Sequence, residues 1–253
     1  MSKVVAVIIA RDEEANLPKT MQILNDHKAN GLIDEIVVVN DASRDKTAST
    51  ARKLGAKVVT HKRVGGKRKA FVTGVLKANE LGATTMLTLD ADIVNFSQKS
   101  LKKMLKTVKD PRKCLMATAQ QHEARRIKKE LGRYGAVGNI YSNAIRAINM
   151  TALEPLMRDN TKWIVPLTLG VHDKNYRWGL EYALEQLVPK NKKVWLRDCP
   201  VYTKEALRKS KNSKDLLRLL KQQVGSRNLI DKIFKKRNED ARLRLKMRKG
   251  RKS

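Results

Sequence analysis

Long apolar runs, paired cysteines and a secretory leader are all missing from this chain of 253 residues. Its longest uninterrupted apolar stretch is Val4–Ala10, far shorter than the roughly 20 residues of a membrane-spanning helix. The opening Met1–Lys3 leads directly into that stretch, without the layout of a signal peptide. Only Cys114 and Cys199 occur, which predicts neither a disulfide framework nor a zinc site. We therefore expect a cytoplasmic protein in a reducing compartment.

Two widespread nucleotide-binding motifs are absent as well. No Gly-x-Gly-x-x-Gly follows the first apolar run, and Gly-x-x-x-x-Gly-Lys-Ser/Thr occurs nowhere in the chain. Those glycines let a backbone approach phosphate groups closely in dinucleotide enzymes and in P-loop NTPases. The sequence therefore disfavours both classes of protein.

Acidic side chains are few, since 25 Asp and Glu stand against 55 Lys and Arg, for a formal net charge of +30. An excess of this size predicts anionic partners, namely nucleotides, phosphorylated substrates, acidic membranes or RNA. Charge alone does not choose among them. The hydrophobic content of 41% is ordinary for a soluble protein, and the length allows one large domain with an appendage.

The segment 4–94 alternates between strand and helix patterns. Short apolar runs predict strands at 4–10, 33–39, 57–60 and 86–94. Polar turns and capping residues between them predict helices that begin near Leu17, after Ser43 or Asp45, and at Ala70. This alternation predicts an α/β fold with a doubly wound, mostly parallel sheet. The later pattern predicts a helix around 101–108, strands at 114–119 and 163–171, and a helix at 182–188.

Two carboxylates, Asp90 and Asp92, interrupt the fourth of these predicted strands one residue apart. Side chains two residues apart on an extended backbone point the same way. We therefore expect both carboxylates at the carboxyl end of a core strand, where ligands bind in open α/β sheets. Two hard oxygen ligands suit Mg²⁺ or Mn²⁺ that carries substrate phosphates. The alternative is a solvated turn, because such triplets arise often by chance.

The polar turns after the other parallel strands are expected at the same edge of the sheet. Arg11–Glu14 follows the first strand and Asn40–Asp41 the second, and carboxylates there can accept hydrogen bonds from a nucleobase and a ribose. Gly66 and Lys67 open a helix whose N-terminal amides and lysine would favour phosphate. A solvated basic loop over 62–69 is the alternative interpretation.

Four motifs in this order resemble those of glycosyltransferase family 2, whose members have the GT-A fold. They are Arg11-Asp12-Glu13-Glu14-Ala15-Asn16-Leu17, Asn40-Asp41-Ala42-Ser43-Arg44-Asp45-Lys46-Thr47, Gly65-Gly66-Lys67-Arg68-Lys69-Ala70 and Asp90-Ala91-Asp92. The second departs from the family's Asp-Asp-Gly-Ser turn, since Asn replaces the first Asp and Ala replaces the Gly. The resemblance implies a nucleotide-sugar site in which Asp41 contacts the base, Glu13 contacts the nucleoside, and Asp92, assisted by Asp90, holds the metal on the diphosphate. It also places Arg11, Gly66 and Lys67 in that site.

The stretch Arg177-Trp178-Gly179-Leu180-Glu181-Tyr182-Ala183-Leu184 resembles the version found in polyprenyl-phosphate sugar transferases. In family 2 the acidic residue that opens this helix is the candidate general base. The resemblance therefore implies a catalytic Glu181, with Asp173 as the alternative and Arg177 as a substrate contact. Stabilisation of the helix dipole explains a carboxylate at this position equally well. His172 stays open between a metal ligand and a surface residue.

The last fifty residues are strongly basic, with 19 Lys or Arg against 5 Asp or Glu in 204–253. Apolar residues at helical spacing, among them Leu216 and Ile233, predict amphipathic helices. Such a tail is typical of a helix that lies on an anionic membrane, and packing on the catalytic domain is the competing interpretation. RNA binding is less favoured, because Phe234 is the single aromatic residue available for stacking.

We therefore predict a GT-A-like domain over 1–203 and a basic helical extension over 204–253. The predicted activity is metal-dependent, inverting transfer of a sugar from a UDP- or GDP-sugar. The expected acceptor is anionic, such as a polyprenyl phosphate at the cytoplasmic face of the membrane. A sugar nucleotidyltransferase is one alternative, although it needs a glycine-rich, arginine-containing first turn that 10–17 lacks. A non-catalytic RNA- or membrane-binding protein on a degenerate fold is the other.

Overall fold

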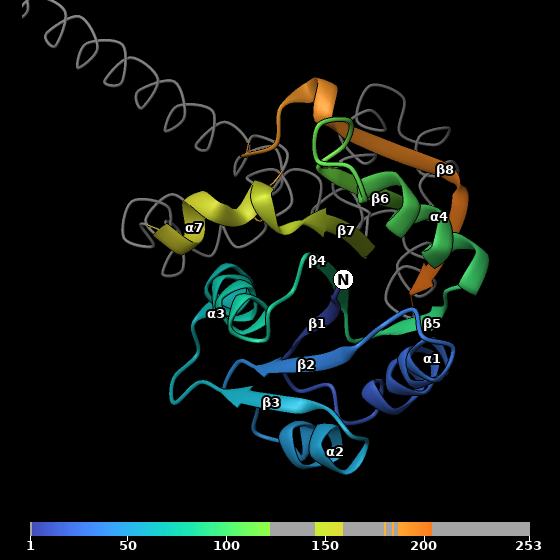
Figure 1. Cartoon of the computed structure of the whole chain (residues 1–253). Helices are drawn as coiled ribbons and strands as arrows, with labels where there is room; N and C mark the ends of the chain where they lie inside the picture. The colour runs from blue at the N-terminus through green and yellow to red at the C-terminus, as the bar shows by residue number, and fades with distance from the viewer. Residues whose placement is uncertain (1, 122–144, 159–179, 181–183, 185–186, 204–253) are drawn as a thin grey trace, which may run out of the picture.

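The computed structural model describes residues 2–121, 145–158, 180, 184 and 187–203. Helices cover both faces of one sheet, whose strands lie in the order β3-β2-β1-β4-β7-β6-β8-β5 (Figure 1). The strands are β1 (Val4–Ala10), β2 (Glu35–Asn40), β3 (Lys57–Thr60), β4 (Thr85–Asp90), β5 (Ile93–Asn95), β6 (Met116–Gln121), β7 (Ile145–Asn149) and β8 (Lys193–Thr203). The helices are α1 (Leu17–Ala29), α2 (Thr47–Lys53), α3 (Gly66–Glu80), α4 (Gln98–Val108), η2 (Met150–Leu153), α7 (Glu154–Arg158) and η3 (Lys190–Lys192).

The first four strands in the order form a parallel half-sheet. β1 lies between β2 and β4, and β2 pairs with β3, all in parallel. β1 and β2 are buried along almost their whole length, as expected for strands covered by helices on both faces. This half confirms the predicted doubly wound α/β fold.

The sheet becomes mixed beyond β4. β7 runs antiparallel to both β4 and β6, and β8 runs parallel to β6 and antiparallel to β5. The carboxyl ends of β1, β2 and β4 therefore lie at one edge of the sheet, while β6 and β8 begin at the opposite edge. We call the first of these edges the rim.

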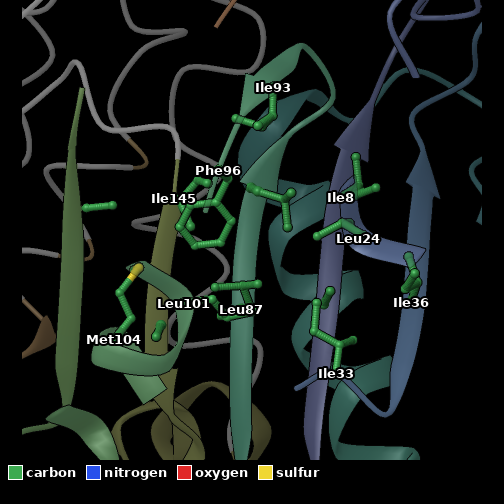
Figure 2. Packing of buried hydrophobic residues seen from close by; sticks show 14 of the residues in the cluster. Ile8, Leu24, Ile33, Ile36, Leu87, Ile93, Phe96, Leu101, Met104 and Ile145 are labelled. Atoms are coloured by element: carbon green, nitrogen blue, oxygen red, sulfur yellow. The ribbon is translucent and has the colours of Figure 1, made fainter. Parts of the chain in front are cut away.

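Two hydrophobic clusters fill the two sides of the sheet. The first packs α1 and α4 against alternate strand residues, including Ile8, Ile36 and Leu87 (Figure 2). The second packs α3, η2 and α7 against the other face, with Phe71 among its largest fully buried side chains. Both cysteines are buried, and they form no disulfide. In the part of the chain that the structure describes, no helix is long and apolar enough to cross a membrane.

Element boundaries differ from the sequence prediction in several places; β6, for example, covers Met116–Gln121 rather than 114–119. β2 begins at Glu35 rather than at residue 33; the carboxylate of Asp34, just before it, accepts the amide of Val4 at 2.7 Å. α3 begins at Gly66, which agrees with the expectation that Gly66 and Lys67 open a helix and corrects the start at Ala70 that the alternating pattern predicts; part of the expected basic loop therefore lies in a helix. β4 ends at Asp90 rather than continuing to residue 94. The expected elements at 163–171 and 204–253, and most of 182–188, lie outside the described residues.

Candidate donor site

The turns that follow β1 and β2 are joined by reciprocal hydrogen bonds between side chains and backbone. The amides of Asp12, Glu13 and Glu14 donate to the side chains of Ser43, Thr47 and Asp45, at 2.8 to 3.0 Å. In return, the amides of Arg44 and Lys46 donate to the carboxylates of Asp12 and Glu14, at 2.7 and 3.0 Å. We call this pair of turns the interlocked turns. Because five bonds cross between them, each turn fixes the shape of the other.

Each of the interlocked turns contains one non-glycine residue in the left-handed region. Asp12 has φ 54° and Ala42 has φ 55°. This conformation costs an L-residue with a side chain roughly 1–2 kcal/mol. Ala42 stands where the family motif has glycine, and its positive φ gives the physical reason for that preference. The cross-turn hydrogen bonds offset the strain.

Asp45 illustrates the electrostatics of these turns. Although the side chain is exposed, the protein atoms around the carboxyl partly desolvate it and push its pKa upward; hydrogen bonds from Thr47 and from the Glu14 amide outweigh this effect and hold the pKa below its ordinary value. The carboxylate also accepts the Thr47 amide at the first turn of α2, but the N-cap position of that helix is Lys46, without a side-chain cap hydrogen bond, so neither Ser43 nor Asp45 is the cap that the sequence predicts. The Asp45 carboxylate therefore accepts hydrogen bonds from backbone amides and stabilises the shape of the two turns.

Asp41 is almost completely buried, and both of its carboxylate oxygens accept hydrogen bonds. Oδ1 accepts from the amide of Gly65 at 2.7 Å and from Nδ1–H of His61 at 2.8 Å. Oδ2 accepts from the amide of Gly66 at 2.7 Å. The other ring nitrogen of His61 lies 2.9 Å from Thr73 Oγ1 in α3. Asp41 thus fixes the point at which α3 begins, and this explains the early start of that helix.

Lys67, the second residue of α3, reaches the end of β4. Its Nζ lies 2.8 Å from Asp90 Oδ1, and the two side chains are 31% and 36% exposed. The lysine predicted to favour phosphate and a carboxylate predicted to hold metal therefore meet at the rim. This arrangement contradicts the alternative of a solvated loop for 66–69, since these residues belong to α3.

Asp90 and Asp92 differ in their surroundings, which corrects the expectation that both lie on one extended strand. Asp90 is the last residue of β4, whereas Asp92 is buried in the turn before β5. The hydroxyl of Thr20, buried in α1, donates to the carbonyl of Ala91 at 2.7 Å and also lies 3.2 Å from the carbonyl of Ile93. Thr20 therefore ties the turn to α1, and the strand ends before Asp92.

The donor set fits a metal that arrives with a substrate. Among the residues that the structure describes, no group of three His, Cys, Asp or Glu side chains is placed to hold a metal ion. Mg²⁺ is commonly held by one or two carboxylates together with substrate phosphates and water. Asp90 and Asp92 match that chemistry, and they do not form a closed protein site.

The remaining predicted residues divide into two groups. Arg11 is exposed, with its guanidinium 3.8 Å from the carboxylate of Asp12, and Glu13 accepts the side-chain amide of Asn16 at 2.7 Å. Both lie in the turn after β1, at the rim. His172, Asp173, Arg177 and Glu181 lie outside the described residues, so their roles stay predictions.

Two residues that position the site were not predicted from the sequence. Thr20 is a polar residue within the apolar stripe of α1, beside Met21, and this mismatch was an available signal. His61 directly follows β3 and faces Asp41. Its partners, Asp41 in the turn after β2 and Thr73 in α3, are 20 and 12 residues away in the sequence. No pattern of neighbouring residues therefore identifies His61 as part of the site.

A parallel α/β half-sheet that gathers a carboxylate pair, a lysine and a helix N-terminus at one rim defines a protein of the GT-A type. A family model described as Glycosyl transferase family 2 matches residues 5–164. The chain belongs to this family, which confirms the predicted resemblance and the predicted class of enzyme, a glycosyltransferase. The match also sets aside the sugar nucleotidyltransferase alternative. None of the curated proteins matches the chain significantly.

Solved structures of a glucosyl-3-phosphoglycerate synthase from Mycobacterium tuberculosis share this fold. Its complex with Mn²⁺, UDP-glucose and phosphoglyceric acid has a TM-score of 0.62 at 15% identity, covering 91% of this chain and 80% of that chain. Its complex with Mg²⁺ and UDP has a TM-score of 0.56 at 15% identity, and the match covers 79% of this chain and 70% of the synthase chain. A mycobacterial protein of 13% identity has a TM-score of 0.58, and the match covers 80% of this chain and 67% of that protein's chain. At identities this low, the structural similarity is evidence for a shared fold and for no more specific property.

Proposed function

We propose that this protein is a metal-dependent, inverting glycosyltransferase that takes a sugar from a nucleotide diphosphate sugar. The observation that carries the proposal is the contact between Lys67 and Asp90 at the rim, beside Asp92 and the N-terminus of α3. A diphosphate needs cations and amide donors, and it brings the missing ligands of a divalent metal. Lys67, at the start of α3, meets Asp90 at the rim, and Asp92 follows Asp90 by two residues.

Asp92, assisted by Asp90, would hold Mg²⁺ or Mn²⁺ in this proposal. The metal would supply neutralisation of the charge that grows on the departing diphosphate. Lys67 would contribute a second positive charge beside it. Arg11, Glu13, Asp41 and Gly66 would contact or frame the nucleoside.

The donor and the acceptor are proposed as classes. The synthase complexes described above contain UDP or UDP-glucose and phosphoglyceric acid, which supports a UDP- or GDP-sugar donor and an anionic acceptor. We favour a lipid phosphate such as polyprenyl phosphate, because the chain's net charge of +30 and its basic 204–253 segment suit an acidic membrane face. Glu181, or Asp173 in its place, would orient the acceptor, and Arg177 would contact it. A cytoplasmic protein peripheral to the membrane follows from these choices.

Donor binding tests the core of this proposal. Thermal shift with UDP- and GDP-sugars, each with and without Mn²⁺, should show stabilisation by one donor that depends on metal. Asp92→Asn should abolish the metal-dependent part and leave the melting temperature without ligand close to that of the parent. Unchanged donor affinity of this variant in Mn²⁺ would refute the metal assignment. Transfer assays with phosphoglycerate and with polyprenyl phosphate then separate the two kinds of acceptor.

A further inference from the structure

Two stretches of the folded domain concentrate positive charge: 62–69 beside the rim, with five Lys or Arg and no acidic residue, and the helix α4 with the turn that follows it. Residues 2–97 hold 15 Lys or Arg and 11 Asp or Glu, a net charge of +4. Residues 98–113, which comprise α4 and the turn after it, hold 7 Lys or Arg and a single acidic residue, a net charge of +6. That acidic residue, Asp110, is paired with Arg112 at 3.1 Å. Sixteen residues therefore carry more net charge than the 96 before them.

The lysines of α4 share one side of the helix. The opposite side is formed by Leu101, Met104 and Val108, which are buried against the sheet. At about 100° per residue, the exposed lysines span roughly a third of the circumference; they are Lys99, Lys102, Lys103, Lys106 and Lys109. Over ten residues the row is about 15 Å long. The exposed side of α4 is therefore basic along its whole length.

A second basic segment extends this surface at the edge opposite the rim. The carbonyl of Lys192 accepts the amide of Leu115 at 2.7 Å, so 190–193 lies beside the turn that follows α4. Lys190 is exposed, and Lys192 and Lys193 are half-buried. We call 98–113 together with 190–193 the basic face; it contains nine Lys and one Arg. α4 packs beside β6 and β8 (Figure 1), on the opposite side of the sheet from α3 and Lys67.

We propose that the basic face docks the folded domain onto an anionic lipid bilayer. This deepens the proposed function, because it assigns membrane contact to the domain itself rather than to the 204–253 segment alone. Lysine is a compact, strongly hydrated charge that suits a layer of headgroup phosphates. Single-stranded nucleic acids are instead held by aromatic side chains on which the bases stack, and neither 98–113 nor 190–193 contains an aromatic residue. The composition of the basic face therefore favours a bilayer over RNA.

The experiment compares two variants of the full-length chain with equal loss of charge. The first carries Lys102→Gln, Lys103→Gln, Lys106→Gln and Lys109→Gln on the basic face. The control carries Lys19→Gln, Arg52→Gln, Lys53→Gln and Lys57→Gln, all exposed and located on α1, α2 and β3. Circular dichroism establishes that both fold as the parent does. Co-sedimentation then measures partition onto phosphatidylcholine vesicles with and without phosphatidylglycerol.

Each basic residue close to an anionic surface strengthens partition about fivefold, equivalent to about 1 kcal/mol. The first variant should lose about 25-fold or more, the effect of two lost contacts, and the control should lose less than about fivefold. Equal losses in the two variants, or no loss in the first, overturn the proposal. So does a result in which the first variant loses binding to polyuridylate while its vesicle binding is unchanged. Nucleotide-sugar binding, measured in parallel, reports on the proposed function separately, since its absence in the parent leaves the vesicle result standing.

Discussion

Asp41→Asn should destabilise the protein by about 3–4 kcal/mol, even though the side chain keeps its size. The carboxylate accepts three hydrogen bonds, two from the amides of Gly65 and Gly66 and one from His61. An asparagine offers one oxygen in place of two, so its NH₂ group must face at least one N–H donor. A hydrogen bond to a charged group contributes about 1.5–3 kcal/mol, and a buried donor left unsatisfied costs about 1–3 kcal/mol. The remaining bonds also weaken, because the acceptor is no longer charged.

Urea unfolding at neutral pH, followed by circular dichroism, measures this loss. Asp45→Asn is the matched control, since Asp45 also accepts backbone amides in a neighbouring turn but is exposed to solvent. Water can replace its lost bonds, so that variant should lose about 1 kcal/mol. Equal losses in the two variants would refute the reasoning. The start of α3 would then not depend on the charged Asp41 carboxylate.

Three further outcomes follow from buried contacts on the two faces of the sheet. Gly74→Ala should cost about 1–3 kcal/mol, because its Cβ would fall well inside van der Waals distance of Val7 Cγ1, and Val7→Ala should restore part of the loss in urea unfolding. Thr20→Val should cost about 1–2 kcal/mol and weaken Mn²⁺ binding measured by electron paramagnetic resonance, whereas Thr20→Ser should do neither. Burial lowers the pKa of His27 below its ordinary value, so the unfolded state takes up the proton first and stability should fall as pH drops from about 7.5 to 5.5. His27→Gln should flatten that dependence in unfolding free energies measured across the same range, and an unchanged slope would assign it to other groups.

The parallel half of the sheet was predictable because its information is local. Runs such as Val4–Ala10 are apolar throughout, and that pattern is typical of a strand buried on both faces. The rule that ligands bind at carboxyl ends of strands then placed Asp41, Lys67 and Asp90 near one another. The structure brings Lys67 and Asp90 into contact, although the sequence suggested no pairing between them.

The positions that were missed depend on contacts between residues far apart in the chain. β4 was extended too far because Ile93 and Val94 continue the apolar pattern, and the bond from Thr20 that ends the strand comes from α1. The alternating pattern alone starts α3 too late, at Ala70, because Gly65 and Gly66 are typical of a loop. Only the carboxylate of Asp41, contributed by another turn, makes them the beginning of a helix. Periodicity and local propensity contain neither contact.

The interlocked turns bear on any attempt to re-engineer the donor specificity of this protein. A graft that replaces 11–16 alone would leave the side chains of Ser43, Asp45 and Thr47 aimed at a backbone of different shape, and a graft of 41–46 alone would do the same to Asp12 and Glu14. Single-loop libraries should therefore return mostly unstable clones. The two turns form one transplantable unit, and recombination that exchanges them together is the productive route.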